Sequence, residues 1–446
     1  MNKLKRWPVV GCVVMAAVVS GCGNSGKSSS STSLRLVNAT THASLELLVN
    51  SSMAIPATAT DKVSDSASPS SGTVTLQIND EKTVTPLAIS IVPLTGGSHY
   101  TVVAYESGGA LKMATLTEDF TAPASGAQMR FYDAATDAGQ LDIYVTTDLL
   151  TPWSALVQQL GTPASLVTKA ATITANTAPA SSGFGLFAAG TYRVFVTGLG
   201  TPTDLRNGLA GTTVTLANLQ TATVLLTPTS TLGGVLVNGS TVIQQVARGY
   251  SAWRNTTARV RLVAAVSGNA KVDATAAGST PIDASTSPTV GNYAIVPAVG
   301  VLTVNVNGVA VTAPTTPPLV AGGDATLLVY GDPGAARASL ITDDNRRPSA
   351  SGTIKLRLVN GVTGTPGPLK MSAGFSQGDD VAAGMASGYL SVAGSTALQI
   401  DVTSPLKPNF FPRSALNLGS DKVYTLFMLG DFAAPIGTPI KDSKDY

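Results

Sequence analysis

Few residues in this chain belong to the types that do chemistry, and their spacing does not favour it. The two histidines, His42 and His99, lie far apart, and neither has a second histidine at metal-ligand spacing. A Ser-His-Asp triad needs only one histidine, but the chain has no G-x-S-x-G nucleophile turn and no G-x-x-x-x-G-K-[ST] phosphate loop. We therefore predict no catalytic residues, no bound metal and no cofactor, and we do not expect an enzyme.

Two other residue types leave an alternative open. The acid-rich stretches TDDN (342–345) and QGDD (377–380) offer oxygen ligands for Ca²⁺, but they lack EF-hand spacing, and turns use Asp and Asn for their own geometry. Trp153 and Trp253 are the only tryptophans beyond Trp7. On loops they would be candidate ligand contacts that stack on sugar rings. The alternative is packing at a domain junction.

The clearest chemical signal is Cys22, which follows an apolar run. Lys3, Lys5 and Arg6 precede that run, and the run is too short to span a bilayer, so residues 1–21 have the pattern of a secretory signal peptide. The sequence VSGC (19–22) resembles the lipobox of bacterial lipoproteins. The resemblance implies acylation of the Cys22 thiol and cleavage just before it, whereas the alternative is a free thiol. An earlier lipobox-like cysteine, Cys12, would be removed with the peptide.

The segment after the cysteine is a tether, and it bears on location. Residues 22–33 are rich in Gly and Ser, which is typical of a flexible linker between a membrane surface and a folded body. We therefore expect an exported protein that contacts the membrane through lipidated Cys22. Among lipoproteins of Gram-negative bacteria, Gly23 rather than Asp at the next position favours the outer membrane, so that location is implied if the source is Gram-negative.

The composition limits the partners and the sources of stability. Charged residues make up 12% of the chain, against a typical value of about 25%. A body so poor in charge lacks the clustered Lys and Arg that neutralise phosphates, so we predict no nucleic-acid binding. Cleavage before Cys22 would leave one cysteine, which excludes an intrachain disulfide and a cysteine-based metal site. The fold must then rely on apolar burial.

The body of the chain repeats one pattern four times. Each copy opens with a short apolar strand whose second residue is arginine: Arg35, Arg130, Arg261 and Arg357. A glycine then begins a strand of alternating apolar residues, at Gly72, Gly190, Gly300 and Gly394. A third apolar strand closes each copy, at 100–105, 222–227, 325–330 and 424–429. The second copy carries an insertion near 147–185, in which Pro152 favours a short helix from Trp153 to Leu160 and the rest is expected to be a loop.

The repeated arginine has two interpretations. It lies on the exposed face of the first strand, where it protects an edge, or it marks a shared ligand-binding position. The residue three positions later is Asn38, Asp133, Ala264 and Asn360 in the four copies, so no polar pair is kept in all of them.

The pattern predicts an all-β protein with four tandem immunoglobulin-like antiparallel β-sandwich repeats after a signal peptide and a flexible tether. Stretches 248–256 and 343–352 are expected to join neighbouring repeats. A row of separate repeats would form a rod, but pairwise docking stays open. The expected segments are a signal peptide (1–21), a tether (22–33) and four repeats (34–125, 128–247, 258–345 and 353–446).

The motifs also resemble a known bacterial family. The opening strand with RLVNA (35–39), the strand LDIYV (141–145), the strand GTYRVFV (190–196) and the closing YTVVAY (100–105) are similar to the bacterial "domain of unknown function 4397". The resemblance implies tandem β-sandwich repeats in secreted or lipid-anchored surface proteins. It brings no activity and no site residues. We expect a lipid-anchored cell-envelope protein with a structural or adhesive role and an unknown protein or glycan partner. The alternative is a glycan-binding accessory lipoprotein on the cell surface.

Overall fold

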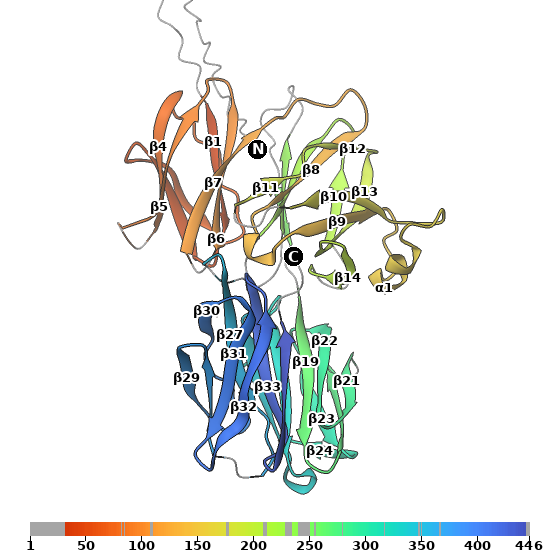
Figure 1. The fold of residues 1–446 in the computed structure, drawn as a ribbon. Helices are drawn as coiled ribbons and strands as arrows, with labels where there is room; N and C mark the ends of the chain where they lie inside the picture. Colours follow the sequence, from red (N-terminus) through yellow and green to blue (C-terminus); the bar gives the residue numbers. More distant parts are fainter. Residues whose placement is uncertain are drawn as a thin grey trace, which may run out of the picture.

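The computed structural model describes residues 32–442, except 82, 84, 108–109, 175–177, 208–211, 228–233, 240–249, 254–255, 279, 316, 347, 349 and 365–366. The signal peptide, Cys22 and the tether up to residue 31 lie outside the described residues. The described chain is nearly all β-structure, arranged as four units of two sheets each. Figure 1 shows units 1 and 2 side by side in one half of the molecule and units 3 and 4 side by side in the other.

The strands follow one another closely within each unit. Unit 1 contains β1 Ser33–Ala39, β2 Ser44–Val49, β3 Ser52–Ala59, β4 Gly72–Asp80, β5 Pro86–Leu94, β6 His99–Ser107 and β7 Ala110–Glu118. Unit 2 contains β8 Ala127–Asp133, η1 Thr136–Ala138, β9 Leu141–Thr146, α1 Trp153–Leu156, η2 Val157–Gln159, β10 Thr168–Ile173, β11 Ala180–Ser181, β12 Gly185–Phe187, β13 Gly190–Gly198, β14 Thr201–Leu205, β15 Thr212–Leu216, β16 Thr221–Leu226, β17 Gly234–Gly239 and β18 Tyr250–Trp253.

Units 3 and 4 repeat the same plan without the insertion. Unit 3 contains β19 Thr257–Val266, β20 Lys271–Ala276, β21 Thr280–Thr286, β22 Thr289–Pro297, β23 Leu302–Val306, β24 Val309–Val311, β25 Asp324–Gly331, η3 Pro333–Ala335 and β26 Arg337–Asp343. Unit 4 contains β27 Thr353–Asn360, β28 Leu369–Ala373, β29 Ser376–Val381, β30 Leu390–Ala393, β31 Ser395–Ser404, β32 Lys407–Leu418, β33 Lys422–Asp431 and β34 Ala434–Lys441.

The first strand of every unit pairs in parallel with the predicted closing strand. β1 lies beside β6, β8 beside β16, β19 beside β25, and β27 beside β33. The other strand pairings are antiparallel. This one parallel pairing places the first strand of each unit beside a strand near its end. The strand that follows the closing strand pairs with it antiparallel in each unit: β7, β17, β26 and β34. Unit 2 then adds β18 beside β17. The sequence analysis placed the closing element one strand too early.

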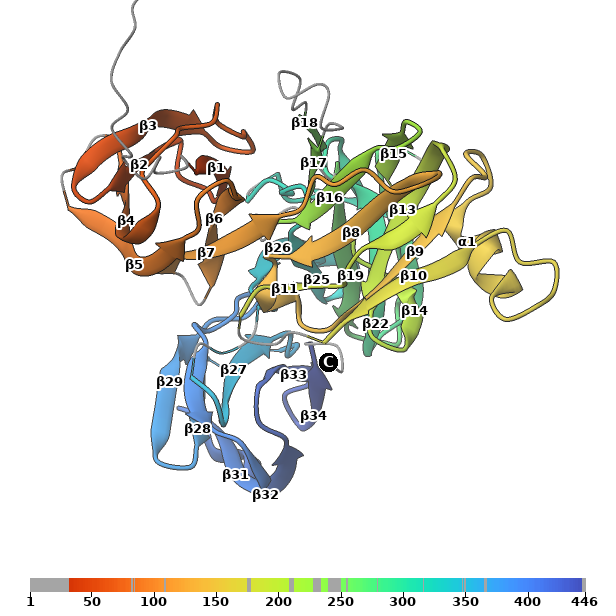
Figure 2. The same cartoon turned by 90° about the horizontal axis from the view of Figure 1, so that it is seen from above.

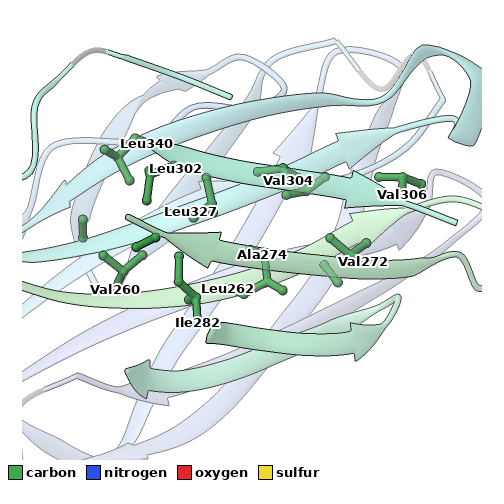
Figure 3. Packing of buried hydrophobic residues seen from close by; sticks show 14 of the residues in the cluster. Val260, Leu262, Val272, Ala274, Ile282, Leu302, Val304, Val306, Leu327 and Leu340 are labelled. Atoms are coloured by element: carbon green, nitrogen blue, oxygen red, sulfur yellow. The ribbon is translucent and has the colours of Figure 1, made fainter. Parts of the chain in front are cut away.

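Each sandwich has its own apolar core. In unit 3, Val260 and Leu262 from the first strand meet Val272 and Ala274 of the second sheet, together with Val304 of β23 (Figure 3). These residues occupy alternate positions, so one face of each strand points into the core. Equivalent clusters fill units 1, 2 and 4. The predicted all-β sandwich repeats are therefore confirmed.

A second apolar layer lies between units 1 and 2. Val37 and Val103 of unit 1 pack with Tyr132 and Leu225 of unit 2. They come from the strand faces opposite the cores, so these central strands are buried on both faces. Figure 2 shows β6 and β7 of unit 1 close to β8 of unit 2.

Units 3 and 4 dock in the same way. Val263 and Leu328 of unit 3 pack with Val359 and Phe427 of unit 4. The alternative of separate repeats in a row is therefore wrong, because neighbours pack face to face in two pairs.

The insertion in unit 2 is more ordered than predicted. The short helix is confirmed, since α1 begins at Trp153 after Pro152 and continues into η2. The expected loop is partly wrong, because β10 pairs antiparallel with β9. Ile295 of unit 3 packs against the apolar cluster formed around the insertion, so the insertion contributes to the contact between the two pairs.

Gly361 offers a direct test of the docking between units 3 and 4. A Cβ at this position would lie 2.8 Å from the Cβ of Ala265 and 3.1 Å from Cδ1 of Leu328, both in unit 3. We expect Gly361→Val to weaken the contact by about 1–3 kcal/mol through overpacking. Amide hydrogen exchange in β19 and β27 should then accelerate.

Gly334→Val is the matched control, because nothing lies within 4 Å of a Cβ at Gly334. Exchange in the interface strands should match that of the parent protein. If Gly361→Val also left this exchange unchanged, the two units would not pack as described.

Candidate functional site: the buried arginine interfaces

The four repeated arginines are buried where the units dock in pairs. Each donates a hydrogen bond from Nε to Oγ1 of a threonine on the parallel closing strand: Arg35 to Thr101 at 2.9 Å, Arg130 to Thr223 at 2.9 Å, Arg261 to Thr326 at 2.8 Å, and Arg357 to Thr425 at 3.0 Å. The parallel register places each arginine directly opposite its threonine. The unit itself therefore fixes the position of its arginine.

The expectation that these arginines lie on an exposed strand face is wrong. Arg35 is 3% exposed and Arg261 is 1% exposed. The alternation itself was correct, because Leu34 and Leu36 enter the core while Arg35 points away from it. The face opposite the core is covered by the neighbouring unit instead of water.

A single carboxylate serves both arginines between units 1 and 2. Glu118 accepts hydrogen bonds from Arg130 Nη2 at 2.6 Å and from Arg35 Nη2 at 3.4 Å. It also accepts one from Thr101 Oγ1 at 2.6 Å. Its side chain is 2% exposed, so the pairs are shielded from water and from salt screening.

Two carboxylates serve the arginines between units 3 and 4. Arg357 donates to Asp343 of unit 3, while Arg261 donates to Asp442 of unit 4 at 2.5 Å. The pairs therefore cross the interface in both directions. Thr326 donates to Asp343 at 2.7 Å, and Thr425 donates to Asp442.

The acids occupy one equivalent position, which the sequence analysis missed. In units 1, 3 and 4, the threonine that accepts the arginine hydrogen bond pairs with a residue of the strand that follows the closing strand. Glu118, Asp343 and Asp442 each lie two residues beyond that paired residue. By register the equivalent residue of unit 2 is Gly239. The signal was present as an apolar residue, any residue and then an acid: LTE (116–118), ITD (341–343) and IKD (440–442).

The two interfaces differ in the number of buried carboxylates, and the pKa values of Arg35 and Arg261 differ accordingly. Burial lowers the pKa of Arg35, and Glu118 opposes this effect. Burial also disfavours the charged form of Arg261, but Asp442 and Asp343 are among the groups that outweigh it and raise its pKa. The first cluster thus holds two guanidinium groups and one carboxylate, whereas the second is balanced.

An aromatic ring covers each guanidinium group. The distances from the arginine Cζ to the ring centroid are 5.6 Å for Phe120 over Arg35, 4.7 Å for Phe184 over Arg130, 4.7 Å for Tyr293 over Arg261 and 4.8 Å for Tyr389 over Arg357. These contacts within cation–π range stabilise a charge that has lost its water.

Carboxylates of the acid-rich stretches lie in strands and in ion pairs. Asp343 ends β26 and pairs with arginine, while Asp344 pairs with Lys355 at 2.8 Å and with Arg346 at 2.7 Å. Asp380 lies within β29 and faces Lys370 at 3.6 Å. Across the described ranges, no group of three or more His, Cys, Asp and Glu side chains is arranged to hold a metal ion.

Of the predicted ligand contacts, Trp153 is buried. It is 5% exposed, stacks on Phe195 with ring centroids 4.6 Å apart, and donates its indole N–H to the Pro202 carbonyl at 2.9 Å. This leaves little ring surface for a sugar and agrees with the packing alternative. Trp253 ends β18, whose backbone extends the sheet of unit 2, so part of the expected linker 248–256 is a strand.

The histidines and Cys22 complete the predicted site residues. His42 lies between β1 and β2, and its Nδ1 is 3.1 Å from Asp80 Oδ2. His99 begins β6, and its ring lies 5.2 Å from that of Phe120. His99 also stands opposite Glu118 in the antiparallel register, so it borders the first arginine cluster. Cys22 lies outside the described residues, so its lipidation stays a prediction.

Comparison with known proteins supports the predicted resemblance. A family model described as "Domain of unknown function (DUF4397)" matches residues 32–144, which span unit 1 and the first two strands of unit 2. The resemblance to this family is thereby confirmed over that range. The matched range contains Arg35, Glu118 and Arg130, which form the ion pairs described at the first interface.

The other comparisons carry less. No curated protein matches the chain. The Bacillus anthracis TIE protein is 8% identical with a TM-score of 0.14, and the match covers 87% of this chain and 65% of that one. The central fibronectin-III array of RIM-binding protein is 11% identical with a TM-score of 0.10, and the match covers 59% of this chain and 81% of that one. No helix within the described ranges is long and apolar enough to cross a bilayer.

Glu118 is the residue on which the first interface should depend most. In Glu118→Gln the side-chain shape is kept, but two buried guanidinium groups lose their carboxylate. We expect a loss of about 3–5 kcal/mol in the free energy of unfolding of units 1 and 2, because an uncompensated buried charge is costly. Denaturant unfolding, monitored through amide hydrogen exchange in β1 and β8, measures this loss.

Asp380→Asn is the control, since the exposed pair between Asp380 and Lys370 should contribute at most about 1 kcal/mol. Equal losses in the two variants would mean that the buried cluster does not hold the units together.

Proposed function

We propose that this chain is a lipid-anchored cell-envelope protein with a structural or adhesive, partner-binding role and without catalysis. Its two pairs of β-sandwiches form the body that is presented outside the membrane. A protein or a glycan binds to the outer surfaces of that body. The anchor is Cys22, and the Gly/Ser-rich tether separates it from β1, which begins at Ser33.

The burial of the charged clusters is the observation that supports this role best. Arginine, threonine and carboxylate side chains gathered in one place would suggest a binding site for an anionic substrate if they lay in an open cleft. Arg261 and Asp343 are instead nearly inaccessible. Their hydrogen bonds with Asp442 and Arg357 join one unit to the next. The chemistry available there is used to fix the units in position.

Firm docking suits a body that transmits force or presents a surface. A sandwich joined to its neighbour by a buried ion pair and an apolar layer cannot rotate freely about a linker. The position of each outer face is then set within a pair, which favours recognition of an extended partner. The match to a domain of unknown function leaves this role as our proposal.

The anchor is tested by replacing the predicted lipidation site. In Cys22→Ser, the protein should lose its hydrophobic modification and move from the membrane fraction to the soluble fraction, because acyl chains supply the membrane affinity. Detergent partitioning of the expressed full chain measures this change. Cys12→Ser is the matched control, since it alters the other cysteine of the same segment and should leave partitioning unchanged. Membrane association retained by Cys22→Ser would contradict the anchor.

The partner-binding role needs a separate experiment. Residues 23–446, produced without the lipid, should bind isolated cell envelopes saturably and should turn over none of a panel of hydrolase substrates. A glycan array and a protease treatment of the envelopes then separate a glycan partner from a protein partner. Turnover of a hydrolase substrate, or a complete lack of envelope binding, would contradict the role even if the anchor were correct.

A further inference from the structure

The third residue after each repeated arginine occupies a slot with a fixed hydrogen-bond pattern. Asn38 is fully buried, and its Nδ2 donates to the carbonyl of Thr58 at 2.9 Å. Its Oδ1 accepts from the backbone N–H of Thr40 at 3.2 Å. The slot thus presents a backbone carbonyl, which accepts from Nδ2, and a backbone N–H, which donates to Oδ1.

Unit 4 fills the same slot with the same chemistry. Asn360 Nδ2 donates to the carbonyl of Val381 at 2.9 Å, and its Oδ1 accepts from the N–H of Val362 at 3.1 Å. In both units the accepting carbonyl belongs to the residue that pairs with the first buried leucine of the second strand, Leu45 or Leu369. Unit 3 has Ala264 here and lacks the polar group.

Unit 2 has an aspartate in this slot. Asp133 is fully buried, and its Oδ1 accepts from the N–H of Ala135 at 2.8 Å, as the asparagines do. Its Oδ2 takes the place of the donating Nδ2 and has no hydrogen-bond partner within the described residues. By strand register the equivalent carbonyl is that of Ile173, which pairs with Leu141. An ionised oxygen is a poor neighbour for a carbonyl, whereas a protonated one donates to it.

We propose that Asp133 is a proton-binding site, held as a neutral carboxylic acid in the folded chain, and that its ionisation loosens unit 2 where it docks on unit 1. The link to docking is direct, since Tyr132 and Ala134 on either side of Asp133 belong to the apolar layer between the units. Asn38 and Asn360 make both hydrogen bonds of the slot with an amide group, which has no titratable proton.

The charges around Asp133 agree with this assignment. Burial raises the pKa of Asp133 to about 7, against the opposing effects of the Ala135 N–H and of Arg206. Arg206 is the cationic group that acts on Asp133, and its guanidinium group is engaged with the Ala138 carbonyl at 2.6 Å. Tyr132 is the neighbouring titratable group, and burial raises its pKa, so it stays neutral across the same range.

The sign of the pH effect follows from the raised pKa. The folded state holds a proton on Asp133 that the unfolded state releases near pH 4, so the stability from this group is complete at low pH. It is lost as pH rises toward about 7, where the folded state also ionises. In that window the unfolding constant should increase by up to about tenfold per pH unit.

Asp133→Asn is the decisive variant. It restores the amide of the sibling units, so it should fold, and its unfolding constant should lack the part of the pH dependence between about pH 5 and about pH 7 that the parent protein shows. Above about pH 7 the variant should be more stable than the parent. Infrared spectra of the parent protein at about pH 5.5, where exposed carboxyl groups are already ionised, should contain a protonated-carboxyl stretch that Asp133→Asn lacks.

The reverse exchange in unit 4 is the matched test. Asn360→Asp should create a second pH-dependent step, because it places a carboxyl group in the same slot. A pH dependence that is identical in the parent protein and in Asp133→Asn, or infrared spectra without a difference at the protonated-carboxyl stretch, would overturn the proposal. If Asp133→Asn failed to fold, an Asp133 pKa in the parent protein near that of an exposed aspartate, measured by NMR, would overturn it as well.

Discussion

A guanidinium group removed from water must meet a carboxylate or pay a large desolvation penalty, and this constraint shapes the whole molecule. Each unit fixes one arginine on its first strand by a hydrogen bond to the threonine opposite. The charged end then points out of the unit's own core. Glu118 also pairs with Arg35 of its own unit. Arg130, Arg261 and Arg357, in contrast, form their shortest ion pairs with Glu118, Asp442 and Asp343 of the neighbouring unit. Docking in pairs is therefore a condition for burying these three arginines.

The two interfaces meet this condition differently, which suggests how partners are matched. Asp343 and Asp442 each compensate an arginine of the opposite unit, so units 3 and 4 contribute equally. Unit 2 has Gly239 at the equivalent position and depends on Glu118 of unit 1. The longer glutamate reaches both arginines. We infer that these pairs select the correct neighbour more than they add net stability, because buried ion pairs often contribute little beyond a well-packed apolar contact.

Much of the fold could be predicted from the sequence, since alternating apolar residues and a fourfold pattern are local signals. The docking could not, because alternation shows that Arg35 points away from the core but does not show what covers that face. A weaker signal was available in closing strands such as TVLLT (223–227). Consecutive residues of such a strand are apolar, which predicts burial on both faces of the sheet. The sequence pattern suggested a turn at Asp343, because its shortest ion pair is with Arg357 of another unit and local spacing does not show it. Trp153 was a candidate ligand contact because no strand could be identified in the sequence against which its ring would pack.

Small-angle X-ray scattering of residues 23–446 tests the central claim, that the units form two docked pairs, most directly. The account predicts a distance distribution that agrees with two bodies of two sandwiches each, with the separation within each pair set by the arginine clusters. Scattering from four separated sandwiches in an extended row, with a correspondingly larger maximum dimension, would contradict it.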